Sequence, residues 1–437
     1  MTATSAHAVG RVEHAAMWIG LFTLTAGLPW EWTQQLTRGQ VSGGSPLVAL
    51  YFIALGGFLM LQMNGHWASV LKILEREPLL LLFLGWVCLS FLWSDDPITT
   101  IRRTIALLIT SYLGVHLVMR FSQFEVLRLV SSVLAAVVGL NFIWIILFPQ
   151  FSGPPGGTSV AGDFDDRLTG IFTSPNPLGR VMALAVFTML AAYKLDRRRR
   201  PMYVVALLVA AGVLALSQSK TALIVSLTTS AMLVVYPVFR ARKTLFGAVA
   251  VSMVTTGVGS VLLLLTNFGA VTRTLDRDVT LTGRIPLWQT LFPEVSNRPL
   301  VGNGYDAFWN GWGSPAQIIW NQNPWLPPHG HNEFLDVTLE LGLIGLAIYV
   351  LLLYRTTLRS TRYIRDISGV FGLWPLTFMS FYFSATITES GVFGRDIVWA
   401  LLVACITLVS LKKRSVDEAY LASKKPTPKA LPQTTSG

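Results

Sequence analysis

The chain has few charged residues for its length. Of its 437 residues, 13% are Asp, Glu, Lys or Arg, which is roughly half the fraction in an average soluble domain. Hydrophobic residues make up 52%, and the mean hydropathy is +0.54. This shortage of charge excludes an ordinary soluble domain and predicts an all-α polytopic membrane protein. In such a protein the formal net charge of +11 first reports topology, so we predict no nucleic-acid partner.

Cysteine is scarce as well. Cys88 and Cys405 both lie in apolar runs, which is typical of packing residues rather than of a disulfide or a metal site. No group of Cys and His residues has the spacing of a zinc site. Asp163-Phe164-Asp165 and Asp276-Arg277-Asp278 match a short acidic pattern for metal binding, but such clusters are commonly solvated turns. We therefore predict no metal ligands and no other cofactor.

Long apolar runs are abundant, and those of about 17–25 residues predict membrane helices. We expect about twelve transmembrane helices within residues 15–411, after a cytoplasmic N-terminus at 1–14 that lacks a signal-peptide cleavage site. Residues 412–437 are rich in Lys, Pro, Thr and Ser and predict a disordered cytoplasmic tail. The expected spans are about 15–33, 46–64, 79–94, 105–121, 127–148, 175–193, 201–217, 220–239, 244–266, 332–354, 367–387 and 394–411.

The loops orient these spans. With twelve spans, the main cationic clusters all fall on one side, which the positive-inside rule identifies as the cytoplasm. Both termini are then cytoplasmic, and residues 267–331 form one long periplasmic loop between spans nine and ten. A loop of this length is more often functional, and we expect short helices in it that lie over the bundle. The clusters are Lys194 with Arg197 to Arg200; Arg240, Arg242 and Lys243; Arg355, Arg359, Arg362 and Arg365; and Lys412, Lys413 and Arg414.

The segment Pro327-Pro328-His329-Gly330-His331-Asn332 leads into the tenth expected span. The prolines disfavour a helix before it, and Asn332 is a good N-cap. If the helix runs on, His331, Thr338, Gly342 and Gly345 share one face, where the glycines would let a neighbouring helix approach closely. Glu333, Asp336 and Glu340 share another face and must find partners inside the bundle. His331 is then either a catalytic base at the membrane boundary or a residue that only helps to start the helix.

Several cations lie on the predicted outer side, where Lys and Arg should be rare. The planar guanidinium of Arg suits phosphate oxygens, although any single one of these residues could be a cation that snorkels at a helix end. The tryptophans of the long loop, among them Trp288 and Trp309, suit sugar rings or form an interfacial aromatic belt. The outer cations are Arg38, Arg102, Arg103, Arg167, Arg180, Lys220, Arg273, Arg277, Arg284, Arg298 and Arg395.

Several of these residues together resemble a known family. His331-Asn332, nine residues, and Gly342-Leu343-Ile344-Gly345 resemble the H-[NSQ]-x9-G-x-x-G pattern of the O-antigen ligase and Wzy-type polymerase superfamily. The resemblance extends over about residues 80–400 and is greatest to exopolysaccharide polymerases of the ExoQ type. The further matching segments, in the expected order, are Trp93 to Pro97 with Arg102 and Arg103, Ser174 to Asn176, Ser217 to Thr221, and Gly283-Arg284 with Pro299 to Gly304.

This resemblance implies an inverting, metal-independent glycosyltransferase with a GT-C-like fold in the bacterial inner membrane, its active site facing the periplasm. His331 matches the catalytic base, and Arg284 matches a diphosphate-binding arginine. Lys220 stands where the family usually has arginine and would lose the bidentate fork. Arg102, Arg103 and Arg180 are further candidates for binding the diphosphate, and His329 is a second candidate base outside the pattern.

The resemblance also implies the partners. The donor would be an oligosaccharide linked to undecaprenyl diphosphate, and the acceptor either another lipid-linked repeat unit, as for a polymerase, or lipid A-core, as for a ligase. Membrane lipids and other polysaccharide-assembly proteins are further expected partners. A lipid-linked-oligosaccharide flippase or other transporter is a third reading, but transporters typically place polar sites near the midplane, often in repeated halves, and the chain shows no internal repeat. A membrane sensor or scaffold is a fourth.

Overall fold

The computed structural model describes residues 10–27, 46–63, 67–152, 167–239, 284–323, 326–367, 369–391 and 393–411. These residues form α-helices, short 3-10 helices and turns, and they contain no strand. The prediction of an all-α protein is therefore confirmed for this part of the chain. Within it both Cys88 and Cys405 are free thiols, as predicted from their apolar surroundings.

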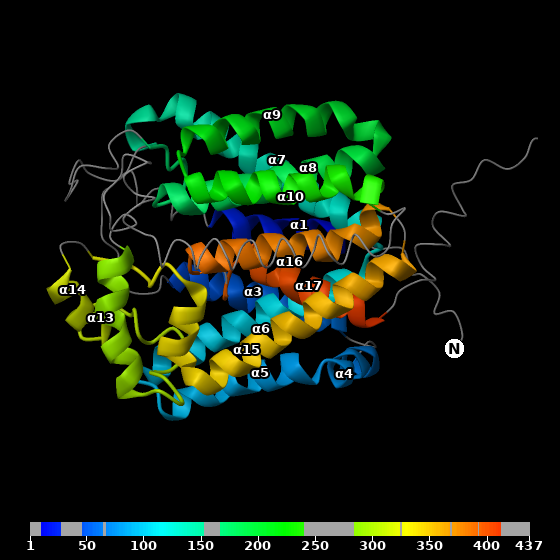
Figure 1. The fold of residues 1–437 in the computed structure, drawn as a ribbon. Helices are drawn as coiled ribbons and strands as arrows, with labels where there is room; N and C mark the ends of the chain where they lie inside the picture. The colour runs from blue at the N-terminus through cyan, green and yellow to red at the C-terminus, as the bar shows by residue number, and fades with distance from the viewer. Residues whose placement is uncertain are drawn as a thin grey trace, which may run out of the picture.

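The long helices run side by side in one bundle (Figure 1). They are α1 (Arg11–Ala26), α3 (Pro46–Met63), α5 (Pro78–Leu89), α6 (Pro97–Arg120), α7 (Gln123–Leu147), α8 (Pro175–Leu195), α9 (Arg200–Leu216), α10 (Lys220–Phe239), α15 (Glu333–Asp366), α16 (Val370–Thr388) and α17 (Ile397–Leu411). The shorter elements are α4 (Trp67–Arg76), α13 (Arg284–Asn297), α14 (Ala316–Gln322) and the 3-10 helices η1 (Ser90–Leu92), η2 (Pro149–Phe151) and η3 (Arg197–Arg199).

Six helical segments of the described chain are long and apolar enough to cross a membrane: Pro97–Arg120, Gln123–Leu147, Pro175–Leu195, Arg197–Leu216, Glu333–Ile364 and Val370–Ile387. Shorter apolar helices lie at four other expected spans, at Val48–Gln62, Pro78–Leu92, Lys220–Val234 and Ile397–Leu411, and α1 overlaps the first. The expected span at 244–266 lies outside the described residues. The chain is therefore an integral membrane protein, while the count of twelve and the position of the long loop remain predictions.

Helices α8 and α17 lie in the interior of the bundle. The apolar window of α8 is 72% buried, against 28% for that of α9, and thirteen residues of α17, from Ile397 to Val409, are buried. Helix α8 packs against α7, α9, α10 and α16, and α17 packs against α6. Helix α9 thus occupies the periphery, and the residues that α8 carries at its N-terminal end are held in a closely packed position.

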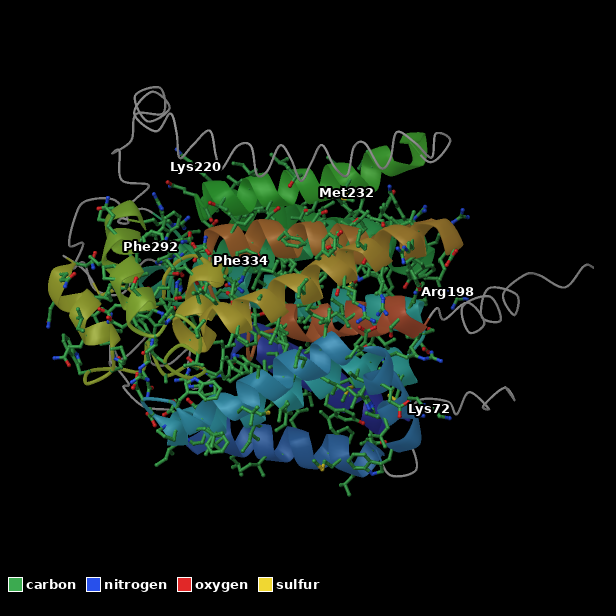
Figure 2. The ribbon with its side chains drawn as sticks, turned by 60° about the horizontal axis from the view of Figure 1, so that its bottom comes forward. Lys72, Arg198, Lys220, Met232, Phe292 and Phe334 are labelled. Carbon is green, nitrogen blue, oxygen red and sulfur yellow. The ribbon has the colours of Figure 1, made fainter. Side chains whose placement is uncertain are left out.

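The two ends of the bundle differ. Helices α13 and α14 lie together at one end (Figure 1), as expected for short helices in the loop that precedes Asn332. Lys220 lies toward this same end, whereas Arg198 and Lys72 lie at the opposite end (Figure 2). Arg198 belongs to a cluster predicted to be cytoplasmic, so this separation agrees with the predicted orientation.

Helix α15 is broken at Gly342, which has φ 68° and ψ −174°. A loop segment, residues 299–304, fills the break. The amides of Leu343 and Ile344 donate to the carbonyls of Pro299 (2.8 Å) and Leu300 (3.3 Å). On the other side, the carbonyls of Leu339 and Glu340 accept hydrogen bonds from the amides of Asn303 and Gly304, both at 2.9 Å. The backbone groups released by the break are thus paired, as a membrane interior requires.

This break corrects the expectation of one helical face that carries His331 and both glycines. His331 lies before the N-cap, and Gly342 is approached by the backbone of Leu300 rather than by a neighbouring helix. Gly345 does face a neighbouring helix, because a Cβ there would lie 3.2 Å from the indole of Trp86 in α5. The acidic face was predicted correctly: Glu333, Asp336 and Glu340 are all buried.

Candidate active site

His331 occupies a strained backbone position. Its φ is 52°, in the left-handed region, which costs a non-glycine residue about 1–3 kcal/mol and persists only where the surroundings impose it. Its neighbour Gly330 supplies one restraint: the Gly330 amide donates to both carboxylate oxygens of Asp336 at 3.0 Å, and its carbonyl accepts from Trp288 Nε1 at 2.8 Å. These contacts, and not the intrinsic backbone preference of histidine, therefore set the direction of the His331 side chain.

Asn332 restrains the other side of His331. Its side-chain Oδ1 accepts a hydrogen bond from the amide of Leu335 at 3.1 Å and caps α15, as predicted. Its own amide donates to Ser390 Oγ at 2.9 Å, and its Nδ2 donates to the carbonyl of Ile387 at 3.2 Å. The start of α15 is therefore tied directly to the end of α16.

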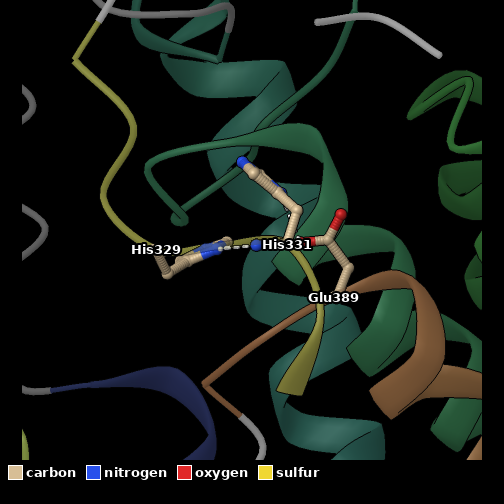
Figure 3. Close-up of side chains that lie close together, drawn as sticks. All are labelled: His329, His331 and Glu389. Atoms are coloured by element: carbon tan, nitrogen blue, oxygen red, sulfur yellow. Dashed lines mark hydrogen bonds and ion pairs between the residues drawn. The ribbon is translucent and has the colours of Figure 1, made fainter. Parts of the chain in front are cut away.

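Glu389, the C-cap residue that follows α16, lies at the centre of the site. Its Oε2 is 3.2 Å from His331 Nδ1 (Figure 3), and its Oε1 accepts from Arg284 Nη2 and from Asn176 Nδ2, each at 2.6 Å. The carboxylate thus joins α8, α13, α16 and the segment before α15. We refer to His329, His331, Glu389, Arg284 and Asn176 as the His331 cluster.

The charge state of Glu389 fixes the tautomer of His331. Burial alone would raise the pKa of Glu389, but the hydrogen bond and charge of His331 and the charge of Arg284 outweigh burial and lower this pKa. An ionised carboxylate only accepts hydrogen bonds, so Nδ1 of a neutral His331 carries the proton. Nε2 of the same ring then carries the lone pair that a base requires.

His329 is packed against His331. The ring centroids are 4.3 Å apart in an edge-on arrangement, and His329 Nδ1 accepts from the His331 amide at 3.3 Å. Burial, followed by repulsion from His331, lowers the pKa of His329 to about 3, so this ring stays neutral. One ring nitrogen of each histidine and one carboxylate oxygen of Glu389 lie within 4.8 Å of one another. The fold thus assembles a potential metal-ligand set that the sequence spacing did not indicate.

Arg180 lines a groove beside the cluster, and Lys220 lies between Ser219 and Thr221, which both line it. Arg180 of α8 donates to the carbonyl of Ser390 and to Asp396 Oδ2, both at 3.0 Å. Lys220, the first residue of α10, is exposed, and among the described residues we find no ion pair for it. The groove is lined by Asn176 and Arg180 of α8, by Thr221, Ala222 and Val225 of α10, and by Glu389.

Arg102 and Arg103 form their contacts outside the His331 cluster. Arg103 forms an ion pair with Asp306, and the exposed Arg102 donates to Thr99 Oγ1 at 3.3 Å. Within the described ranges, neither has a hydrogen bond or ion pair with the His331 cluster. Arg103 instead fastens the segment after residue 304 to α6.

Trp288 and Trp309 support the histidine segment. Trp288 Nε1 donates a hydrogen bond to the Gly330 carbonyl, and Trp309 Nε1 donates to Asp336 Oδ1, both at 2.8 Å. Both indole N–H groups are therefore engaged within the protein. Trp312 is different, because 64% of its surface is exposed, which suits it better to an external contact such as a sugar ring.

The sequence did not reveal two members of the cluster. Asn176 belongs to the segment Ser174 to Asn176, which matched the family, but the sequence assigned it no role. Glu389 lies in Thr388-Glu389-Ser390-Gly391, the short outer connection between the last two expected spans. An isolated carboxylate at the predicted outer surface was the available signal, but its contact with His331 spans 58 positions of sequence.

Comparison with known proteins agrees with the motifs. Residues 204–350, which include His331 and Arg284, match the family model described as O-antigen ligase. The chain is 29% identical over 340 residues to the exopolysaccharide production protein ExoQ of Rhizobium meliloti (strain 1021), which covers 71% of this chain and 73% of ExoQ.

Shorter similarities point the same way. A protein of Rickettsia bellii (strain RML369-C), named as a candidate polysaccharide ligase, is 35% identical over 75 residues, 16% of this chain and 18% of its own length. A similarly named protein of Rickettsia conorii is 31% identical over 90 residues, 20% of each chain. The resemblance predicted from the motifs is thus confirmed: residues 204–350 are similar to the O-antigen ligase family, and the chain as a whole is similar to ExoQ.

Proposed function

We propose that the chain is an inverting glycosyltransferase that polymerises exopolysaccharide repeat units carried on undecaprenyl diphosphate, at the periplasmic face of the bacterial inner membrane. The observation that carries this proposal is the hydrogen-bonded pair of His331 Nδ1 and Glu389 Oε2, 3.2 Å apart, beside the guanidinium of Arg284. A histidine oriented by a carboxylate is a recurring arrangement for a general base.

The reaction would proceed in one displacement. Nε2 of His331 takes the proton of an acceptor sugar hydroxyl while the hydroxyl oxygen attacks the anomeric carbon of the donor. The bond from that carbon to the diphosphate oxygen breaks, and its electron pair leaves with undecaprenyl diphosphate. The new glycosidic bond has the opposite anomeric configuration. Glu389 stabilises the imidazolium that forms and keeps the ring in the productive tautomer.

The leaving group determines what the cations must do. Negative charge grows on the diphosphate as the bond breaks, and fixed donors that face this charge lower the barrier. Arg284 and Lys220 are our candidates, and Arg180, which lines the groove, is a third. Arg284 is already held by Glu389 at 2.6 Å, so it is positioned before the donor arrives. These cations provide for the charge without a metal ion, and we propose that turnover is metal-independent.

The similarity to ExoQ favours a polymerase over a ligase, because it extends over 71% of the chain whereas the matches to candidate polysaccharide ligases cover 16–20%. A ligase that transfers glycan to lipid A-core would use the same chemistry with a different acceptor. A flippase would have no need of a base paired with a carboxylate at the end of the bundle.

The direct test is transfer by the purified full-length protein with undecaprenyl-diphosphate oligosaccharide, with and without chelator. We expect chain elongation in both conditions and release of undecaprenyl diphosphate. A requirement for lipid A-core as acceptor would identify a ligase. Deletion of the gene should abolish long extracellular polysaccharide and leave lipopolysaccharide intact; accumulation of long lipid-linked glycan with uncapped lipopolysaccharide would contradict the polymerase.

Glu389→Gln is expected to lower kcat by about 10²-fold, since the amide removes the charge that stabilises the imidazolium and can present an N–H to Nδ1. The KM for the donor should change less than kcat, because the side chain keeps its shape and its contact with Asn176. Steady-state kinetics and a thermal unfolding curve separate the two roles. An unchanged kcat, or a loss of activity that parallels a loss of thermal stability, would show that Glu389 serves only the fold.

Lys220→Ala is expected to raise the donor KM by about tenfold or more, because a hydrogen bond to a charged group contributes about 1.5–3 kcal/mol. Lys220→Arg should retain the affinity or improve it, since it restores a bidentate phosphate donor. The measurement is donor KM at fixed acceptor. Lys72→Ala, an exposed lysine at the opposite end of the bundle (Figure 2), is the matched control. Equal effects of the Lys220 and Lys72 substitutions would remove Lys220 from the site.

A further inference from the structure

We propose that His329, His331 and Glu389 form a binding site for a divalent transition-metal ion, Zn²⁺ in particular, and that the bound ion inhibits transfer by occupying the His331 imidazole. The site itself follows from the geometry of the three side chains, and only its inhibitory effect rests on the proposed function. Two imidazoles and one carboxylate are a ligand set that recurs in zinc and non-haem iron proteins.

The distances suit a small ion. Zinc binds nitrogen and oxygen ligands at about 2.0–2.2 Å in tetrahedral geometry, which places neighbouring ligand atoms roughly 3.3 Å apart. His331 Nδ1 and Glu389 Oε2 are already 3.2 Å apart, and all three ligand atoms lie within 4.8 Å of one another (Figure 3). One edge of the tetrahedron is therefore formed, and a shift of the His329 ring completes the three-ligand face.

The surroundings orient the ligands. Arg284 and Asn176 both bind Oε1 of Glu389, which leaves Oε2 directed at the histidines. Gly330, between the two histidines, is fixed through its amide by Asp336 and through its carbonyl by Trp288. Metal sites commonly depend on such outer contacts to hold carboxylate and imidazole ligands in place.

Carboxyl groups offset the nearby guanidinium charges. Each of the two closest guanidinium groups is paired with a carboxyl group, Arg284 with Glu389 and Arg180 with Asp396. Asp336, which binds the Gly330 amide, adds a third carboxyl group to these two. A divalent ion at the histidines would therefore face more carboxyl groups than guanidinium groups.

Occupation of this site would block the base. An imidazole that binds a metal through one nitrogen carries its proton on the other, so neither nitrogen of His331 could accept the proton of a sugar hydroxyl. The ion would also neutralise Glu389, which the proposed mechanism uses to stabilise the imidazolium. Zinc should therefore act as a reversible inhibitor of an enzyme that needs no metal.

Binding is tested without substrate. The full-length protein in detergent is stripped with chelator and titrated with Co²⁺, whose visible absorption reports coordination, and then with Zn²⁺, which should displace it. We expect one equivalent bound, with affinity at least tenfold lower in His329→Gln and in Glu389→Gln. His14→Asn, at an exposed position of α1, should bind as the wild type does. Absent binding, or binding that both ligand substitutions leave unchanged, would overturn the site.

Inhibition is tested separately with the lipid-linked donor. Zn²⁺ added to stripped enzyme should lower turnover at least tenfold at saturation, and chelator should restore it. Turnover that is lost in chelator and restored by Zn²⁺ would overturn the inhibitory role. A protein that binds one Co²⁺ but never transfers glycan would contradict the proposed function and leave the metal site standing, so the two failures are distinguishable.

Discussion

His331→Asn is expected to lower the rate of glycan transfer by about 10²–10⁴-fold, the range that a positioned general base contributes. Asparagine is chosen because it tolerates the left-handed backbone better than most residues, and His331 has φ 52°. The substitution thus removes the base with little added strain. Donor KM should stay within a few-fold of the wild-type value, since Arg284 and Lys220 remain.

The measurement is single-turnover transfer with saturating lipid-linked donor, together with a thermal unfolding curve. His14→Asn provides a control for a histidine in an exposed helical position of α1, and it should leave the rate unchanged. His331→Ala should lose the same activity and also some thermal stability, because alanine is poorly suited to this φ. Activity of His331→Asn within a few-fold of wild type would exclude His331 as the base.

Gly342→Ala is expected to destabilise the fold more than any other substitution considered. With φ 68° and ψ −174°, Gly342 occupies a region that is essentially restricted to glycine. A Cβ at this position would lie 2.2 Å from the carbonyl carbon and oxygen of Leu300. The 299–304 segment would have to leave the break, and its hydrogen bonds to α15 would be lost. Strain and lost bonds together suggest about 3 kcal/mol or more.

This effect is measured as a fall in the apparent Tm of roughly 6–12 °C, taking about 2–4 °C for each kcal/mol, and as a lower yield of folded protein. Gly85→Ala is the matched control, because Gly85 lies within α5 and a Cβ there would meet no atom within 4 Å. That change should be neutral or slightly stabilising. If the two variants unfold alike, the break at Gly342 is not a determinant of stability.

The sequence predicted the class of the protein better than it predicted the contacts of the candidate site residues. Composition was sufficient to predict a helical membrane protein, because few backbone structures can satisfy their hydrogen bonds inside a bilayer. His331 and Arg284 were chosen from motifs, and the fold brings both to the same carboxylate. Glu389 could not be paired with them in advance, because the contact depends on how the end of α16 meets the start of α15. Arg103 was chosen by its predicted side of the membrane, which says nothing about its neighbour Asp306.

Gly342 shows a second limit of prediction from the local sequence. A glycine within an apolar run is ordinarily interpreted as a packing position for another helix, and its periodicity with Gly345 supported that interpretation. The left-handed backbone at Gly342 is stabilised by partners 38 to 43 positions earlier in the chain, in the 299–304 segment. Local pattern carries no information about such a partner, so a continuous helix was the reasonable expectation.

The filled break in α15 has a consequence for the order in which the protein matures. Before residues 299–304 dock, a bilayer offers the amides of Leu343 and Ile344 no partners except the preceding turn of their own helix. We therefore expect α15 to insert as an unbroken helix and to open at Gly342 when the 299–304 segment arrives to accept those bonds. The same docking would bring α13 and Arg284 to Glu389. Membrane insertion and assembly of the His331 cluster would then be successive events, and a chain caught between them would be fully inserted with this cluster unformed.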